Sequence, residues 1–217
     1  MRKINIIYIK NKNIQLSISF IEFILKKSNS LIKIIDNRKA EDIINDAKPI
    51  NCIFYTKDSN KEEYIEIIFK VFDIVSFHRS IDSFVIAAYD HVGILSEEPY
   101  DKHNMDQIKG ILKTNCILFD YEEPRDIICF FVKIFFDILT EHRLSNGNKR
   151  VATSLLYKLC YYHGFFINNS YENWQNNEEK IIYFVKKYEN SRDQEKVKKE
   201  IYDWLKENLY IAPNFTE

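Results

Sequence analysis

The stretch Asp126–Gly164, DIICFFVKIFFDILTEHRLSNGNKRVATSLLYKLCYYHG, places a short polar loop between two largely apolar segments. Its first part, Asp126–Glu141, is apolar almost all round, which predicts a central helix buried on most sides. Its last part, Val151–His163, predicts a second helix for which Gly164 is the C-terminal stop. The stretch therefore predicts two packed helices joined by the polar loop His142–Arg150.

The rest of the chain after about Ser80 is also mostly helical in its pattern. Apolar residues at helical spacing predict further helices at Ile81–Tyr89, Glu178–Tyr188 and Gln194–Leu209. Two segments are less regular: Gly93–Tyr121 is mixed, with a short strand possible at Asn115–Tyr121, and the polar Asn168–Asn177 predicts a loop. We therefore expect residues 79–217 to form one helical domain.

The N-terminal part of the chain alternates between two patterns. Short β-branched or aromatic runs predict strands, at Ile4–Ile9, Leu31–Ile35 and Asn51–Tyr55. Segments with helical spacing follow them, at Leu16–Lys27, Ala40–Ala47 and from about Asn60 onward. In the last of these, Glu62, Glu63 and Glu66 suit the positive end of a helix dipole.

This βαβαβα order predicts a small α/β unit with a partly parallel sheet over residues 1–78. No glycine precedes Gly93, which argues against a Walker-type or dinucleotide-type phosphate loop in this unit. Only four glycines and four prolines occur in the chain, which favours helices over a sheet-and-turn architecture. The expected fold class is thus α+β, mostly α.

Composition also limits the partners and the compartment. A formal net charge of −1 argues against direct binding of nucleic acid or of an anionic membrane. The longest apolar stretch is interrupted by Lys133 and Asp137, and the N-terminal apolar run breaks too soon for a signal peptide. The four cysteines share no ligand spacing and are interpreted as reduced thiols. We expect a soluble cytoplasmic protein.

The loop HRLSNGNKR combines side chains that suit the binding and transfer of a phosphate. The N-terminus of the helix after it offers unpaired backbone N–H groups and the positive end of a dipole. Gly147 allows close backbone approach, Asn148 can donate to a phosphate oxygen, and Lys149 and Arg150 supply cations. His142 lies just before the loop, where an imidazole can take a proton from an attacking hydroxyl. The loop therefore favours phosphoryl or nucleotidyl transfer.

The same loop resembles the signature of the Fic/Doc family, whose pattern is His-x-Phe-x-Asp/Glu-Gly/Ala-Asn-Gly/Lys-Arg. The match is in register at five positions, which are His142, Gly147, Asn148, Lys149 and Arg150. The resemblance extends over roughly Ser80 to Leu209, with a buried helix before the motif and an aliphatic helix after it. It implies a Fic/Doc-like helical domain that follows the small α/β unit.

The resemblance also implies an activity and its residues. It makes His142 the general base and assigns nucleotide and phosphate binding to the five residues Asn146, Gly147, Asn148, Lys149 and Arg150. It implies ATP or another nucleotide and Mg²⁺ as cofactors, with Asn146 at the metal position. Lys149 and Thr153 resemble the Doc-like branch, which transfers phosphate, more than the branch that transfers AMP.

The partners that the resemblance implies are a protein target and an inhibitor. The target would carry a Ser, Thr or Tyr hydroxyl, and the inhibitor would be the antitoxin of a toxin–antitoxin system. The chain would then be a transferase that acts as a toxin. A flap that aligns the target segment is expected between Gly93 and Tyr121.

Two departures from the family pattern leave a second function open. Leu144 stands where the family has Phe, and Asn146 stands where it has an acid that binds Mg²⁺. An amide is a poorer ligand than a carboxylate for a hard cation. The alternative is a catalytically weakened, Fic-like binding module. The other histidines, which are His78, His91, His103 and His163, have no comparable motif and are interpreted as structural or surface residues.

Overall fold

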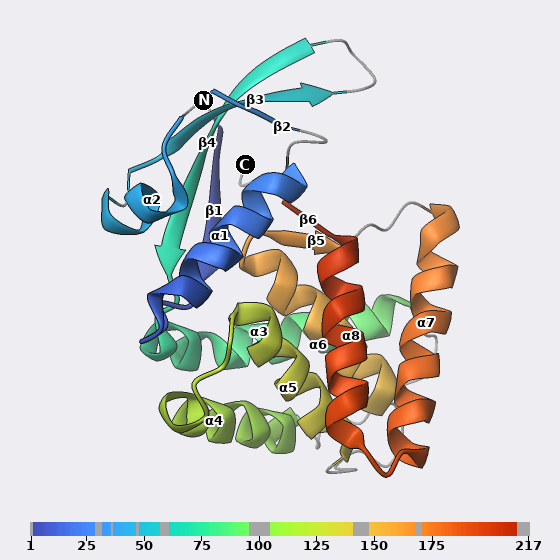
Figure 1. Cartoon of the computed structure of the whole chain (residues 1–217). Coiled ribbons are helices and arrows are strands. Elements are labelled where there is room, and N and C mark those ends of the chain that lie inside the picture. Colours follow the sequence, from blue (N-terminus) through green and yellow to red (C-terminus); the bar gives the residue numbers. More distant parts are fainter. Residues whose placement is uncertain are drawn as a thin grey trace.

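A computed structural model describes residues 2–28, 32–35, 37–46, 48–56, 61–95, 105–140, 148–167 and 171–211. Within these ranges the chain is mostly helical, with one small mixed sheet and one short two-stranded sheet (Figure 1). The expected α+β class with a majority of helix is confirmed. The helices are α1 (Ile14–Ser28), α2 (Ala40–Asp46), α3 (Ile74–Leu95), α4 (Met105–Glu122), α5 (Ile127–Thr140), α6 (Asn148–Tyr162), α7 (Tyr171–Asn190) and α8 (Gln194–Asn208). The strands are β1 (Arg2–Tyr8), β2 (Ile32–Ile34), β3 (Ile50–Thr56), β4 (Lys61–Val71), β5 (Phe165–Ile167) and β6 (Leu209–Ile211).

The larger sheet has the strand order β1-β4-β3-β2. Strands β1 and β4 are parallel, whereas β4 with β3 and β3 with β2 are antiparallel, so the partly parallel sheet is confirmed. The helix expected from about Asn60 is wrong, because Lys61–Val71 is strand β4. Ile65, Ile67 and Phe69 are buried at every second position, a period that places them on one face of a sheet. The unit is therefore βαβαββ rather than βαβαβα.

Two further expectations for the helical part need correction, and two short strands were not expected. Asn115–Tyr121 is not a strand but lies in α4, whose buried residues Ile108, Ile111, Leu112 and Asn115 follow a helical stripe. The predicted loop at Asn168–Asn177 is wrong from Tyr171 onward, where α7 begins. Strands β5 and β6 were not predicted, because three residues are too few to show an alternating pattern.

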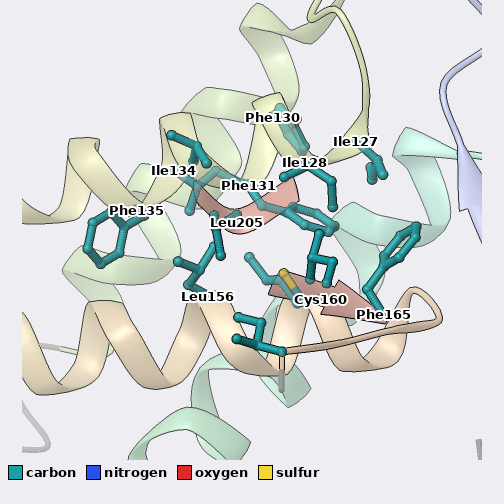
Figure 2. Packing of buried hydrophobic residues seen from close by; sticks show 14 of the residues in the cluster. Ile127, Ile128, Phe130, Phe131, Ile134, Phe135, Leu156, Cys160, Phe165 and Leu205 are labelled. Carbon is teal, nitrogen blue, oxygen red and sulfur yellow. The ribbon is translucent and has the colours of Figure 1, made fainter. Parts of the chain in front are cut away.

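Helix α5 forms the centre of the helical part, as its sequence predicts. Ten of its 14 residues are buried. Figure 2 shows Phe131 and Ile134 of this helix beside Leu156 and Cys160 of α6 and Leu205 of α8. A helix that is apolar almost all round is stable in water only when other elements cover it on most sides, and this arrangement provides that cover.

The C-terminal end of α6 is packed against the first strand of the sheet. Gly164 ends the helix with φ +92°, which confirms the predicted stop. The backbone N–H of Ile7 donates to the carbonyl of His163 at 3.2 Å, and the rings of Phe20 and Phe165 are in edge contact. The sheet and the helices are thus in direct contact. The division into residues 1–78 and 79–217 stays a prediction, with its boundary inside α3.

Every helix among the described residues is too short or too polar to cross a bilayer.

Candidate functional site

The predicted site lies at the junction of α5 and α6. Helix α5 ends at Thr140 and α6 begins at Asn148. His142, Asn146 and Gly147 fall in residues 141–147, outside the described residues, as does Leu144. Asn148, Lys149 and Arg150 are the first residues of α6, which thus begins earlier than the expected Val151.

The amphipathic pattern of α6 directs its first charged residues outward. Val151, Ala152 and Leu155 are buried against the core, whereas Lys149 and Arg150 are exposed. The first N–H groups of an α-helix have no partner within the helix, and they carry a partial positive charge. Two exposed cations therefore stand next to a helix terminus that itself favours an anion.

Lys149 is held by an acid from a neighbouring helix. Its Nζ lies 3.3 Å from Oε1 and 3.5 Å from Oε2 of Glu189, in the last turn of α7. The two side chains are 49% and 41% exposed, so water screens the pair. In the structure, the ammonium group of Lys149 is therefore directed toward a carboxylate.

Helix α7 also contacts α5, the helix that precedes residues 141–147. The ring of Tyr188 stacks on Phe136 of α5, with a centroid distance of 4.3 Å. Thr140 Oγ1 donates to the carbonyl of Phe136 at 2.9 Å and so continues the last turn of α5. The neighbouring residues Tyr188 and Glu189 thus contact the elements before and after 141–147. Sequence reasoning missed both residues, although an acid in a last helical turn was a visible signal.

A polar cluster fixes α4 against α5 one turn before the loop. The side chain of Asn115 donates to Asp137 Oδ2 at 2.9 Å and accepts from Lys133 Nζ at 2.7 Å. Lys133 Nζ also donates to Asp137 Oδ2 at 2.7 Å. Asn115 is 2% exposed, so these hydrogen bonds offset its desolvation and specify the register of the two helices. The predicted flap region Gly93–Tyr121 is thus helical from Met105 onward, and residues 96–104 lie outside the described residues.

His91 and Ser154 are hydrogen-bonded but do not form a nucleophile–base pair. His91 Nδ1 lies 3.0 Å from Ser154 Oγ, which in turn donates to the carbonyl of Ala88 at 3.0 Å. The only hydroxyl proton of Ser154 is thus used by Ala88, which leaves His91 Nδ1 as the donor. Burial lowers the pKa of His91, as does the nearby charge of Lys158, so the imidazole is neutral near pH 7. The pair joins α3 to α6.

His163 is enclosed by aromatic side chains. Its ring centroid lies 4.8 to 6.0 Å from those of four phenylalanines, Phe72, Phe77, Phe84 and Phe131. Its Nδ1 lies 2.6 Å from the carbonyl of Leu159, and the residue is 7% exposed. Burial lowers the pKa of His163 to about 4, so it is a neutral part of the core.

The cysteines and the other ionisable groups add no metal site in the described part of the chain. All four cysteines are free thiols, and burial raises the pKa of Cys116 to about 11 and that of Cys160 to about 12. These thiols stay protonated near pH 7 and are poor nucleophiles. Among the described residues, no three His, Cys, Asp or Glu side chains lie close enough together to share a metal ion. Asn146, the predicted metal position, lies outside them.

Comparison with known families, with curated proteins and with solved structures gives no match to this chain. The resemblance to the Fic/Doc family therefore rests on the motif and its surroundings.

Proposed function

We propose that this protein is a nucleotide-dependent transferase that modifies a hydroxyl group on a protein. The observation that carries the proposal is the start of α6 at Asn148, directly after the segment 141–147 that contains His142. This start supports a site in which Asn148, Lys149 and Arg150 bind phosphate oxygens together with the N–H groups of the helix terminus. Helix α5, which precedes this segment, is largely buried and would therefore be a rigid support for the site.

In the proposed reaction, the oxygen of a Ser, Thr or Tyr hydroxyl on the target attacks the γ-phosphorus of ATP. A new O–P bond forms, the bond to the β-phosphate oxygen breaks, and ADP leaves. His142 accepts the hydroxyl proton, and Lys149 and Arg150 stabilise the charge on the transferred and leaving groups. Transfer of AMP would use the same residues, with attack on the α-phosphorus and pyrophosphate as the leaving group.

The proposed transferase uses Mg²⁺ as a cofactor, because this cation would neutralise phosphate charge when the nucleotide is bound. Asn146 offers an amide oxygen there, a weaker ligand for this cation than a carboxylate. The phosphate oxygens of the nucleotide would then supply most of the ligands of Mg²⁺. The protein would act in the cytoplasm as a toxin, and its partner would be a protein antitoxin.

The test uses purified protein, Mg²⁺ and a cell lysate, with ATP labelled at either the α- or the γ-phosphate. Label from the γ-position in a lysate protein is the expected result, and the variant His142→Ala should lose it. Label from the α-position would mean transfer of AMP. Absence of label with every nucleoside triphosphate tried would contradict the transferase proposal.

Asn146 favours one alternative, a binding module that retains the phosphate site but has lost turnover. The small α/β unit would then bind the target protein. The two proposals differ in the effect of His142→Ala on cells that express the protein. Loss of toxicity in the folded variant supports the transferase, whereas unchanged toxicity supports the binding module.

A further inference from the structure

Helix α4 lies at the lower edge of the molecule, and one of its faces points away from the core (Figure 1). Its buried stripe packs on the inner side, against α3 and α5. On the outer side, Ile117 is 68% and Tyr121 is 84% exposed, which makes them the two most exposed large hydrophobic residues in the described part of the chain. Single exposed apolar residues are common, but these two lie one helical turn apart on the same face.

The same face continues toward the N-terminus of α4 with smaller residues. Gly110 and Thr114 are exposed, and a Cβ at Gly110 would meet nothing within 4 Å. Positions 110, 114, 117 and 121 are spaced by four, three and four residues, which is the spacing of the a and d positions of a coiled coil. We call these four residues the α4 seam. Its small residues lie in one half and its large residues in the other.

We propose that the α4 seam binds the α4 seam of a second copy of this chain, with the two helices antiparallel about a twofold axis. In that arrangement the large half of each seam meets the small half of the other. Tyr121 packs over Gly110 of the second copy, and Ile117 packs against the methyl group of Thr114. Because the contact is symmetric, each of these pairs occurs twice. This inference does not depend on the proposed function.

The charges beside the seam fit the same arrangement. Lys113 and Asp120 are both exposed and lie seven residues apart, so they are on the same flank of the seam. In an antiparallel pair related by a twofold axis, this flank meets itself in reverse order, and Lys113 of each copy faces Asp120 of the other. In a parallel pair the flank would instead meet the opposite one, where Ile111 and Leu118 offer no charge. Charge and side-chain size therefore favour the same orientation.

The test measures the oligomeric state of the full chain by sedimentation velocity over a range of concentrations. One helix from each copy makes a small interface, so we expect a dimer that dissociates on dilution, with a Kd of about 10–100 µM. Ile117→Glu places two charges near the centre of the seam and should abolish the dimer over the same range. Ile182→Glu is the matched control, because Ile182 is a 38% exposed residue of α7, and this variant should dimerise like the wild type.

A charge exchange tests the antiparallel arrangement. Lys113→Glu places a carboxylate opposite Asp120 of the other copy and should raise the Kd by about tenfold at about 50 mM salt. The double variant Lys113→Glu, Asp120→Lys exchanges the two charges and should restore the Kd of the wild type. Each substituted side chain is exposed, and thermal unfolding checks that each variant is folded.

Three results would overturn the proposal. A wild type that stays monomeric at every concentration would exclude a second copy as the occupant of the seam. A dimer that tolerates Ile117→Glu would form through another surface. Failure of the charge exchange to restore the Kd would exclude the antiparallel contact between Lys113 and Asp120.

Discussion

The two ends of α6 differ in burial, charge and neighbours. At the C-terminal end, His163 lies among four phenylalanine rings and Gly164 packs against the backbone of β1. At the N-terminal end, Lys149 and Arg150 are exposed, and Lys149 pairs with Glu189, an acid that is also exposed to water. One end is fixed by close packing, and the other presents charge.

If the proposed function is right, one helix serves stability at one end and phosphate binding at the other. Close packing at the C-terminal end fixes the helix axis relative to the sheet, since the carbonyl of His163 accepts a hydrogen bond from Ile7 of β1. The N-terminus of the helix is then held in place while Lys149 and Arg150 stay exposed. Substitutions at the two ends should therefore change different measured quantities.

The largest expected effect is on stability, at Gly164. A Cβ there would lie 2.3 Å from the carbonyl oxygen of Asn5 and 3.1 Å from the Cα of Ile6, and φ is +92°. Gly164→Ala should therefore lower the free energy of unfolding by about 3 kcal/mol or more, measured by denaturant titration.

The chain provides a matched control for this substitution. Gly110 lies within α4, and a Cβ at that position meets nothing within 4 Å. Gly110→Ala should raise the free energy of unfolding by about 0.5–1 kcal/mol, because alanine restricts the unfolded chain more. Equal effects of the two substitutions would mean that α6 is not packed against β1 as described.

The second-largest expected effect is the pH dependence of the free energy of unfolding, which arises from His163. Its folded-state pKa of about 4 is below the unfolded value of roughly 6.5, so the unfolded chain binds the proton first as pH falls. Stability contributed by the neutral imidazole is therefore lost as pH falls below about 6.5, by about 2 kcal/mol between pH 7 and pH 5.

His163→Phe isolates this contribution, since phenylalanine fits an aromatic environment and does not titrate. The free energy of unfolding of the variant should fall less than that of the wild type between pH 7 and pH 5. Parallel pH curves for the two proteins would show that His163 is not buried in its neutral form.

The smallest expected effect on stability is at Lys149. Removal of an exposed ion pair by Lys149→Ala should change the free energy of unfolding by at most about 1 kcal/mol. If the proposed function is right, the same substitution lowers the rate of transfer by about tenfold or more, because a charged phosphate contact is lost.

Lys48→Ala is the matched control for Lys149→Ala. Lys48 is exposed and pairs with Asp46 at 3.0 Å in the small α/β unit. The control should show the same small change in stability and no loss of transfer. Equal transfer rates in both variants would contradict a role for Lys149 in binding phosphate.

The sequence predicted the elements whose pattern is long and unambiguous. Helix α5 is apolar nearly all round, and α8 follows helical spacing almost to the predicted bounds. Strand β4 was misread because Glu62, Glu63 and Glu66 resemble the first turn of a helix, although Ile65, Ile67 and Phe69 alternate. The prediction followed the three acids instead of the period-2 alternation of apolar residues. That alternation identifies a strand clearly only when its pairing with β1 and β3 is known.

For the site, the sequence by itself determined which residues are close along the chain: His142, Gly147, Asn148, Lys149 and Arg150 form one short motif between two helices. It also determined that Gly164 ends α6, since this is a property of the local backbone. Only the tertiary structure decided that Glu189 pairs with Lys149, 40 residues away, and that Tyr188 stacks on Phe136. Contacts between distant segments depend on how helices pack against one another, and no local pattern specifies that packing.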